Sequence, residues 1–324
     1  MNKIRSFFLA IIFLLCNFCF AQIPAGYYDS AFHKSGYELK TSLKNIIKGH
    51  KRLAYGSGNC GNCVWYAYRS TDAKPDGTVW DMYTDSVFNF GYVTQDAIGY
   101  QCGNNGSQEG NCYSREHSFP KSWWAATTSD GSDLSDTMFT DLNHLFPADQ
   151  YINNMHNNHP LGEVSSPTKT SNKGYKLGPN KLVGYSGIAF EIIDEYKGDF
   201  ARAYLYMATR YEDRIAAWAS NADAQPMLNG TSTQCFTDWA KDMLVRWHEL
   251  DPISQKEIAR NDSVYKIQHN RNPFIDYPEL VNKIWGSDDI PFGEDAPASG
   301  YSIQYILKKD GVVIETKTLG IPGE

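Results

Sequence analysis

Apolar residues recur along this chain with the three-to-four-residue spacing of amphipathic helices. Residues 38–49 place Leu39, Leu43 and Ile47 on one face of such a helix. Three later stretches show the same spacing, at 199–218, 235–250 and 254–267. The dipeptide Gly198–Asp199 is the expected N-cap of the first of these three. The pattern predicts helices that each bury one face.

Other parts of the chain favour short strands. Aromatic residues alternate with turn signals such as Lys74–Gly77 across residues 54–100, which predicts short strands and loops. Near the C-terminus, Tyr301–Leu307 and Val312–Leu319 flank an Asp-Gly turn, the pattern of a β-hairpin. We therefore expect an α+β protein, with mixed helices and short strands in the main domain and a small C-terminal β-hairpin extension.

The first 21 residues have the pattern of a secretory signal peptide. Lys3 and Arg5 precede the apolar run Phe7–Phe20, and Ala21 is a small residue before the expected cleavage point. After this segment we expect a main domain at 22–286, an acidic Pro/Gly-bearing linker at 287–300, and the hairpin at 301–324 as a fragment or the start of an accessory module. The sequence thus predicts an exported protein, either secreted or held in a periplasm.

Composition and charge narrow the choice of function. Hydrophobic residues make up 42% of the 324 positions, as in a packed globular protein. Because Lys3 and Arg5 leave with the signal, 28 of the 30 basic residues remain against 37 acidic ones, a net charge of about −9. This excess of acid argues against a general electrostatic binder of nucleic acid but leaves room for a local phosphate site. We expect a monomer without a membrane span.

Five cysteines remain after the signal, so at least one thiol has no partner within the chain. They are Cys60, Cys63, Cys102, Cys112 and Cys235. Cys102 and Cys112 bracket a Gly/Asn-rich loop and form the favoured pair. Cys60 and Cys63 are interpreted as a structural disulfide or inert thiols, because the strand-then-helix setting of a redox Cys-x-x-Cys motif is missing.

The candidate catalytic and metal-binding residues lie in a polar stretch between residues 101 and 180. Glu116 and His117 are adjacent, so an extended backbone would point their side chains to opposite sides. Hydrolysis of a phosphodiester needs a cation to offset charge and a base of near-neutral pKa to activate water. Mg²⁺ prefers oxygen ligands and keeps several waters, so Glu116 and the amide of Asn153 would suffice as protein ligands.

Four blocks of the sequence resemble the endonuclease I nucleases of the His-Me finger (ββα-metal) superfamily, in their secreted bacterial branch. The blocks are Arg115–Trp123, Asp141–Pro147 with Ile152 and Asn153, Lys197–Arg202 leading to Tyr206–Tyr211, and Asn270–Asp276. They occur in order across about residues 27–286. The resemblance implies a β-hairpin that carries Glu116 and His117 and a helix that carries Asn153, joined around one divalent ion.

The resemblance also implies roles for individual residues. His117 would activate the water, and Glu116 and Asn153 would hold Mg²⁺, with Mn²⁺ or Ca²⁺ as alternatives. The family commonly has His at the position of Asn143 and Arg at that of His156. The remaining candidates, for contact with substrate phosphate or for support of the primary residues, are Lys121, Asn143, His144, His156 and Arg202.

The sequence therefore predicts a secreted, metal-dependent endonuclease that cleaves DNA, and RNA as a further substrate, without sequence specificity and leaves 5′-phosphate ends. Three alternatives stay open: a secreted ribonuclease of the same fold, a catalytically weakened nucleic-acid-binding protein, and a structural zinc protein built on His144, His156 and His159.

Trp123 and Trp124 are expected in the core, and Arg271 and Asn272 are expected to stabilise a turn.

Overall fold

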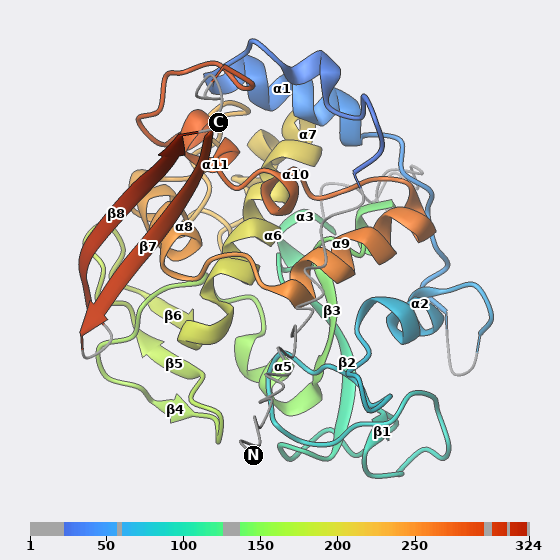
Figure 1. Cartoon of the computed structure of the whole chain (residues 1–324). Helices are drawn as coiled ribbons and strands as arrows, with labels where there is room; N and C mark the ends of the chain where they lie inside the picture. The colour runs from blue at the N-terminus through green and yellow to red at the C-terminus, as the bar shows by residue number, and fades with distance from the viewer. Residues whose placement is uncertain (1–22, 57–59, 126–136, 295–299, 310–311, 323–324) are drawn as a thin grey trace, which may run out of the picture.

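The computed structural model describes residues 23–56, 60–125, 137–294, 300–309 and 312–322. Helices and short strands alternate along the described chain, which confirms the predicted α+β class (Figure 1). The expected signal peptide lies outside the described residues, as do part of the linker and the tip of the C-terminal hairpin. No helix in the described ranges has both the length and the apolar character needed to cross a membrane.

A strand–strand–helix unit forms the part of the fold that carries the candidate residues. Strand β2 (Cys112–His117) pairs antiparallel with β3 (Leu145–Asp149), and helix α5 (Gln150–His156) follows β3 directly (Figure 1). The short β1 (Tyr100–Gln101) pairs in parallel with the first two residues of β2 only. Beyond Tyr113, the edge of β2 that faces β1 therefore has no strand partner among the described residues.

The turn from β3 into α5 is fixed by two buried carboxylates. Asp149 caps α5, because its Oδ1 accepts a hydrogen bond from the backbone N–H of Ile152 at 3.0 Å. Asp81 in turn accepts from the backbone N–H of Asp149 at 3.0 Å. Burial raises the pKa of Asp81 to about 6. These bonds set where α5 starts and thereby position Asn153.

The helices pack around α6 (Lys197–Arg210), in which every residue is buried. Figure 1 shows α6 near the centre, with α1 across one end of the molecule and the β4–β6 sheet towards the other. That second sheet is antiparallel and consists of β4 (Lys169–Thr170), β5 (Lys176–Pro179) and β6 (Ile188–Glu191). The remaining helices are α1 (Gly36–Ile47), α2 (Val64–Thr71), α3 (Ser122–Ala125), α7 (Glu212–Trp218), α8 (Asp238–Leu250), α9 (Gln255–Gln268), α10 (Pro273–Asp276), α11 (Leu280–Trp285) and the 3₁₀ turns η1 (Asp29–Ala31) and η2 (Asp194–Tyr196).

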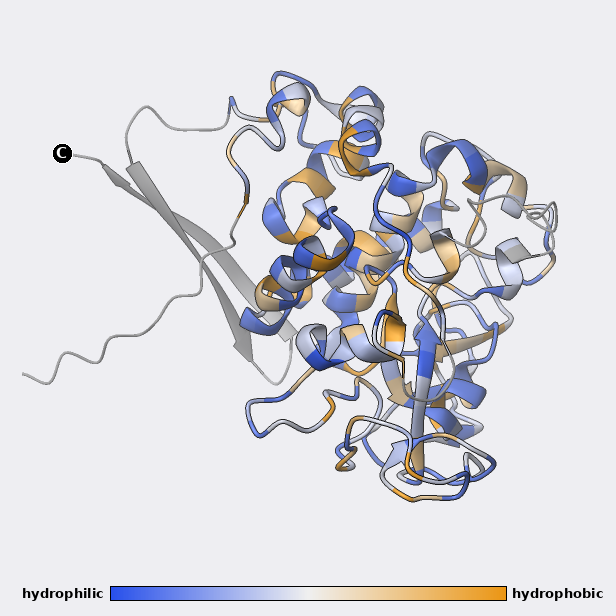
Figure 2. Ribbon diagram, turned by 90° about the vertical axis from the view of Figure 1, so that its right-hand side faces the viewer, coloured by the Kyte–Doolittle hydropathy of each residue, from blue (hydrophilic) through white to orange (hydrophobic). Residues whose placement is uncertain are grey.

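The amphipathic pattern predicted these helices well where one face meets the core. Figure 2 shows hydrophobic and hydrophilic residues alternating around most of them. Helix α1 buries Leu39, Leu43 and Ile47, as the spacing predicted. Helices α8 and α9 match the predicted stretches at 235–250 and 254–267, and Ser254 and Glu257 form a capping box at the start of α9.

Two predictions of local structure were wrong. The stretch 199–218 is two helices, α6 and α7, separated at Tyr211, and α6 begins at Lys197 rather than after a cap at Gly198–Asp199. Residues 54–100 contain helix α2, whose one buried face includes Val64 and Tyr68. Its eight residues make only two turns, too short for the periodicity to stand out among the surrounding aromatics.

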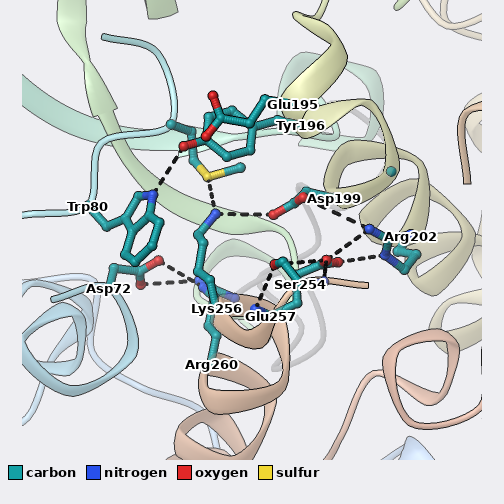
Figure 3. A network of polar contacts seen from close by, with 12 residues as sticks. Asp72, Trp80, Glu195, Tyr196, Asp199, Arg202, Ser254, Lys256, Glu257 and Arg260 are labelled. Atoms are coloured by element: carbon teal, nitrogen blue, oxygen red, sulfur yellow. Dashed lines mark hydrogen bonds and ion pairs between the residues drawn. The ribbon is translucent and has the colours of Figure 1, made fainter. Parts of the chain in front are cut away.

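A buried network of ions links α6, α9 and α2 (Figure 3). Arg202 in α6 pairs with Glu257 in α9, with Nε–Oε1 at 2.5 Å and Nη2–Oε2 at 2.9 Å. Arg260, one turn further along α9, pairs with Asp72 at the end of α2 at 2.8 Å. Arg260 also donates to the backbone carbonyls of Leu142 and Leu145, which fixes the start of β3.

The cysteines and the turn residues lie where the sequence favoured them. Cys102 pairs with Cys112, Cys60 pairs with Cys63, and Cys235 is a buried free thiol. Trp123 and Trp124 are in the core, as predicted. Arg271 pairs with Asp262 and Asp276, and Asn272 caps α10, so both residues stabilise the turn before that helix.

The C-terminal residues form the predicted hairpin. Strand β7 (Gly300–Lys309) pairs antiparallel with β8 (Val312–Pro322), with a register shift between Leu307 and Lys308.

Candidate active site

Glu116 and His117, at the end of β2, face different surroundings. The carboxylate of Glu116 contacts Tyr83 and His156, whereas the ring of His117 contacts Phe139 and Tyr55. They share none of these partners, in agreement with the expected alternation of side chains along an extended strand. The unit can therefore present an oxygen ligand on one side of β2 and a base on the other.

Glu116 is almost fully buried, with 3% of its surface exposed. Its Oε1 accepts a hydrogen bond from the hydroxyl of Tyr83 at 2.7 Å and lies 2.5 Å from Nδ1 of His156. The second oxygen, Oε2, forms no hydrogen bond with the described residues. One oxygen is thus held in place while the other is left without a protein donor.

Asn153 lies on the face of α5 that meets β2. Its Nδ2 donates to Oγ of Ser114 at 3.1 Å and lies 3.4 Å from the carbonyl of Arg115. Because the amide nitrogen is used in this way, the amide oxygen is the group left over, and it accepts no hydrogen bond from the described residues.

The two contacts between α5 and β2 bring Glu116 and Asn153 to the same place. Ser114 and Glu116 are two residues apart on β2, so their side chains point to the same side of the strand. Asn153 and His156 lie one helical turn apart on α5. Since Asn153 contacts Ser114 and His156 contacts Glu116, the amide and the carboxylate are neighbours across this interface. Their uncommitted oxygens are hard donors of the kind that Mg²⁺ prefers, so these residues fit a divalent ion.

His117 is held by a hydrogen bond from Nε2 to the backbone carbonyl of Phe139, at 3.0 Å. The rings of His117 and Phe139 stack with centroids 5.0 Å apart. Burial lowers the pKa of His117 well below its ordinary value, and the nearby His144, Lys121 and Arg115 lower this pKa further. The carbonyl of Phe139 fixes Nε2 as the protonated nitrogen, so Nδ1 carries the lone pair that can accept a proton.

His144 and Asn143 are both buried. Nε2 of His144 lies 2.8 Å from the carbonyl of Met138, and the ring lies 5.5 Å from the ring of His117. Asn143 Nδ2 lies 3.4 Å from Oδ1 of Asn270. The ring of His144 thus packs against His117, whereas the side chain of Asn143 contacts Asn270; both are too deeply buried to reach a phosphate without a change of conformation.

Lys121 and Arg202 have opposite environments. Lys121 is exposed, and its Nζ lies 4.3 Å from the ring centroid of Phe139, next to His117. Arg202 is fully buried. It forms an ion pair with Glu257 (Figure 3) and donates a hydrogen bond to the backbone carbonyl of Asp251. A phosphate contact from Arg202 would require this ion pair to open, so we leave Arg202 out of the proposed site.

A pocket of about 390 Å³ opens beside Asn153. It is lined by Tyr55, Trp65, Cys102, Gly103, Ser114, Arg115, Gln150 and Asn153. The guanidinium of Arg115 lies 3.2 Å from the ring centroid of Tyr55 and donates to the carbonyls of Tyr55 and Gly56. The guanidinium of Arg115 therefore lies at the wall of the pocket. It forms no ion pair with a carboxylate in the described part of the chain.

Sequence reasoning missed Arg115 and Tyr83 as parts of the site. Arg115 opens the motif Arg115–Trp123, so its position beside Glu116 was the available signal. Tyr83 is 33 residues before Glu116, in a loop, and nothing in the sequence connects the two. The zinc alternative built on His144, His156 and His159 finds no support, because the described residues contain no group of three His, Cys, Asp or Glu side chains arranged to hold a metal.

A family model described as Endonuclease I matches residues 35–279, which include Glu116, His117 and Asn153. The chain belongs to the endonuclease I family. As an endonuclease I family nuclease, it is a phosphodiester hydrolase.

Two curated relatives of this endonuclease I chain are similar over most of their length. An "Extracellular ribonuclease" of Bacillus amyloliquefaciens is 33% identical over 269 residues, which cover 80% of this chain and 78% of the relative. An "Extracellular ribonuclease" of Bacillus subtilis (strain 168) is 32% identical over the same shares. The similarity covers most of the expected main domain.

Proposed function

We propose that this protein is a secreted, Mg²⁺-dependent endonuclease that hydrolyses RNA and DNA without sequence specificity and leaves 5′-phosphate ends. The observation that carries the proposal is the environment of His117. Its Nε2 is held by the carbonyl of Phe139, so Nδ1 remains as a base at the end of β2, the strand that also carries Glu116 and contacts Asn153 through Ser114. The strand–strand–helix unit of β2, β3 and α5 is, in this proposal, a ββα-metal core.

Glu116 and Asn153 would hold the divalent ion, with Mn²⁺ and Ca²⁺ as alternatives to Mg²⁺. When bound, the ion supplies positive charge that offsets the negative charge of the phosphate and of the departing 3′ oxygen. Tyr83 and His156 orient the carboxylate of Glu116, and Ser114 orients the amide of Asn153. Glu116 and Asn153 provide two ligands, so a bound ion would take its remaining ligands from water and the substrate phosphate.

His117 acts as the general base. Nδ1 takes a proton from a water molecule, whose oxygen attacks the phosphorus as the bond to the 3′ oxygen breaks. The 3′ oxygen leaves as a hydroxyl after protonation by solvent, and the phosphate stays on the 5′ side. The lowered pKa of His117 keeps its imidazole neutral, which is the form that this step needs. Lys121 and Arg115 are placed to contact the phosphate.

RNA is the substrate favoured by the comparisons, since both relatives carry the name "Extracellular ribonuclease". A ribonuclease with little activity on DNA is therefore the second candidate. Among the described side chains that line the pocket, none is assigned to recognition of a 2′-hydroxyl. A site that binds phosphate and metal contacts the backbone of the nucleic acid and not its bases. This supports cleavage of both polymers.

The pattern at residues 1–21 and the names of the relatives support secretion, with a periplasmic location as the alternative. The acidic net charge predicts modest affinity for nucleic acid that falls steeply with salt. Degradation of nucleic acid outside the cell fits both properties.

Parallel digestion of supercoiled plasmid, single-stranded DNA and RNA, each with Mg²⁺ and with excess EDTA, tests the proposal. We expect nicking of the plasmid and shortening of both single strands in Mg²⁺, and no cleavage in EDTA. Cleavage of RNA alone would select the ribonuclease candidate. Equal cleavage in EDTA would contradict the metal-dependent mechanism.

A further inference from the structure

A second pocket, of about 480 Å³, lies where the end of α1 meets the end of α6. Its walls are formed by Lys44, Lys48, Gly49, His50, Thr137, Arg210 and Asp213. Lys44 is on α1, Lys48 to His50 follow that helix directly, and Arg210 is the last residue of α6. None of these residues belongs to the site around His117.

Positive charge dominates this pocket. Lys44 pairs with Asp213 at 2.9 Å, and Asp213 is the one acidic residue among the described residues of the lining. Nζ of Lys48 donates to the neutral amide oxygen of Asn45, and Arg210 donates from Nε to Nδ1 of His50 at 3.3 Å. Within the described chain neither Lys48 nor Arg210 has a carboxylate within 4.0 Å. The lining thus carries two cations, Lys48 and Arg210, that form no direct ion pair with the described part of the chain.

His50 gives independent support for a ligand here. Its side chain is 7% exposed, and within the described chain its Nε2 has no well-aligned hydrogen-bond partner, although the backbone of Thr137 acts on the ring and partly offsets the lowering of its pKa by burial. The nearest carboxylate oxygen, Oδ2 of Asp141, is 3.7 Å away and accepts hydrogen bonds from the hydroxyls of Tyr206 and Tyr211 instead. A buried polar atom without a partner is rare in folded proteins, and in the wall of a basic pocket it suits a group with acceptor oxygens.

The chain itself joins this pocket to the candidate active site. His50 lines the basic pocket, and Tyr55, five residues later, lines the pocket beside Asn153 and stacks on Phe139. Lys51 and Arg52 are exposed between them. Five residues of extended chain span at most about 18 Å. A single strand of nucleic acid would cover this distance with about five nucleotides, at about 3.4 Å per nucleotide.

A second connection runs through the segment that holds His117. Thr137 lines the basic pocket, and two residues later the carbonyl of Phe139 accepts the hydrogen bond from His117. The basic pocket and the candidate active site therefore adjoin the same short segment of chain.

We propose that the basic pocket binds a backbone phosphate of the polynucleotide substrate, a few nucleotides from the bond that is cleaved. The substrate would then run along residues 48–55, between the pocket of Lys48 and the pocket of Asn153. This inference rests on the proposed nuclease function and adds to it a phosphate-binding site away from the metal. Contacts to phosphate carry no sequence information, in keeping with a nonspecific enzyme.

Binding without cleavage tests this site directly. The double variant Lys44→Gln with Lys48→Gln removes two charges from side chains that are not fully buried, and Lys169→Gln with Lys181→Gln removes two exposed charges from the β4–β5 region as a matched control. Fluorescence anisotropy of a labelled 20-nucleotide single strand, measured in EDTA over a series of salt concentrations, gives the Kd and its salt dependence.

We expect the Lys44/Lys48 variant to raise the Kd about tenfold at low salt and to reduce the slope of log K against log salt by about 0.7, the value for one lost phosphate contact on a single strand. The control variant should stay within about twofold of the wild type. Equal Kd values and slopes for the wild type and the Lys44/Lys48 variant would overturn the inference. A weakened affinity for a mononucleotide with unchanged affinity for the 20-mer would also overturn it, because the pocket would then hold free phosphate groups.

Cleavage of long and short substrates separates this site from the catalytic one. For the 20-mer, the Lys44/Lys48 variant should lose about tenfold in kcat/KM through a higher KM, while a dinucleoside monophosphate, too short to reach the pocket, should be cleaved at the wild-type rate. An equal loss on both substrates would overturn the inference. A wild-type protein that cleaves no polynucleotide would instead reject the proposed function itself.

Discussion

Nδ1 of His156 lies 2.5 Å from Oε1 of Glu116, inside the buried contact between α5 and β2. The ring of His156 stacks on Phe190 at 4.8 Å between centroids, and the side chain is fully buried. The residue at this position, which is commonly Arg in the family that the motifs resemble, therefore points at the proposed metal ligand. It orients Glu116 from behind and does not face solvent.

Removing the ring of His156 should destabilise the protein. His156→Ala leaves the carboxylate of Glu116 with only Tyr83 as a donor, and a hydrogen bond to a charged group contributes about 1.5–3 kcal/mol. We expect the free energy of unfolding in urea to fall by at least that amount. His159→Ala, at a partly exposed histidine three residues later, serves as the control. Equal stability of the two variants would contradict the role given to His156.

The general base is tested by His117→Ala. We expect the rate of nucleic acid cleavage to fall by about 10²–10⁴-fold, the range for loss of a general base, while the fold persists. His33→Ala, at an exposed histidine, controls for the loss of an imidazole as such. Plasmid nicking and circular dichroism of both variants give the comparison. Wild-type turnover in His117→Ala would remove His117 from the mechanism.

Glu116→Gln separates metal binding from proton transfer. The amide keeps the shape of the side chain but loses the charge that binds a hard cation, so the Mg²⁺ concentration for half-maximal activity should rise at least tenfold. Direct titration with Mn²⁺, followed by electron paramagnetic resonance, should show the same loss of affinity. Glu195→Gln, at an exposed carboxylate, should leave both titrations unchanged. Superimposable Mn²⁺ titrations for Glu116→Gln and the wild type would refute the ligand assignment.

Arg202 is expected to contribute to stability and not to substrate binding. Arg202→Met leaves the buried Glu257 without its partner, which costs about 3–5 kcal/mol in comparable cases. Arg214→Met, at a partly exposed arginine, should change stability by less than about 0.5 kcal/mol. Urea denaturation measures both, and KM at a temperature where Arg202→Met is folded should match the wild type. A raised KM with unchanged stability would restore the phosphate role for Arg202.

The carboxyl of Asp251 should make stability depend on pH. Burial raises the pKa of Asp251 to about 7, and the neighbouring Asp199 raises this pKa further. The folded protein therefore binds this proton more tightly than the unfolded chain does, whose Asp has a pKa of about 3.9. Its stabilising contribution is complete below about pH 4 and is lost as the pH rises to about 7.

Asp251→Asn should remove this dependence, because the amide oxygen can still accept from the backbone N–H of Gly198 but cannot ionise. We expect the difference in unfolding free energy, wild type minus variant, to decrease from pH 4 to pH 7 and to level off above that. Urea titrations at pH 4.5, 6 and 8 measure the difference. A constant difference across these values would show that Asp251 does not bind its proton more tightly in the folded state.

The sequence could predict elements whose signal is local. The spacing of Leu39, Leu43 and Ile47 predicted α1 to within two residues at each end, and the Asp-Gly turn predicted the C-terminal hairpin. Helix α2 could not be predicted in this way, because it has only eight residues and its stability comes from the core on which Val64 and Tyr68 pack. Short helices depend on such tertiary packing more than on their own propensity.

By itself the sequence predicted the chemistry that is proposed for this protein and the family to which the chain belongs. The opposed side chains of Glu116 and His117 follow from their adjacency and the alternation of an extended backbone, and the motif blocks pointed to Asn153, which lies in α5 after β3. Only the tertiary structure decided which polar residues serve the site and which serve the core. Arg202 lies in a motif block yet forms a buried ion pair, whereas Tyr83 and Lys48 reach their positions by contacts between segments far apart in the chain. The physical reason is that a charged side chain is defined by its partners and its exposure, and both are set by packing over long sequence distances.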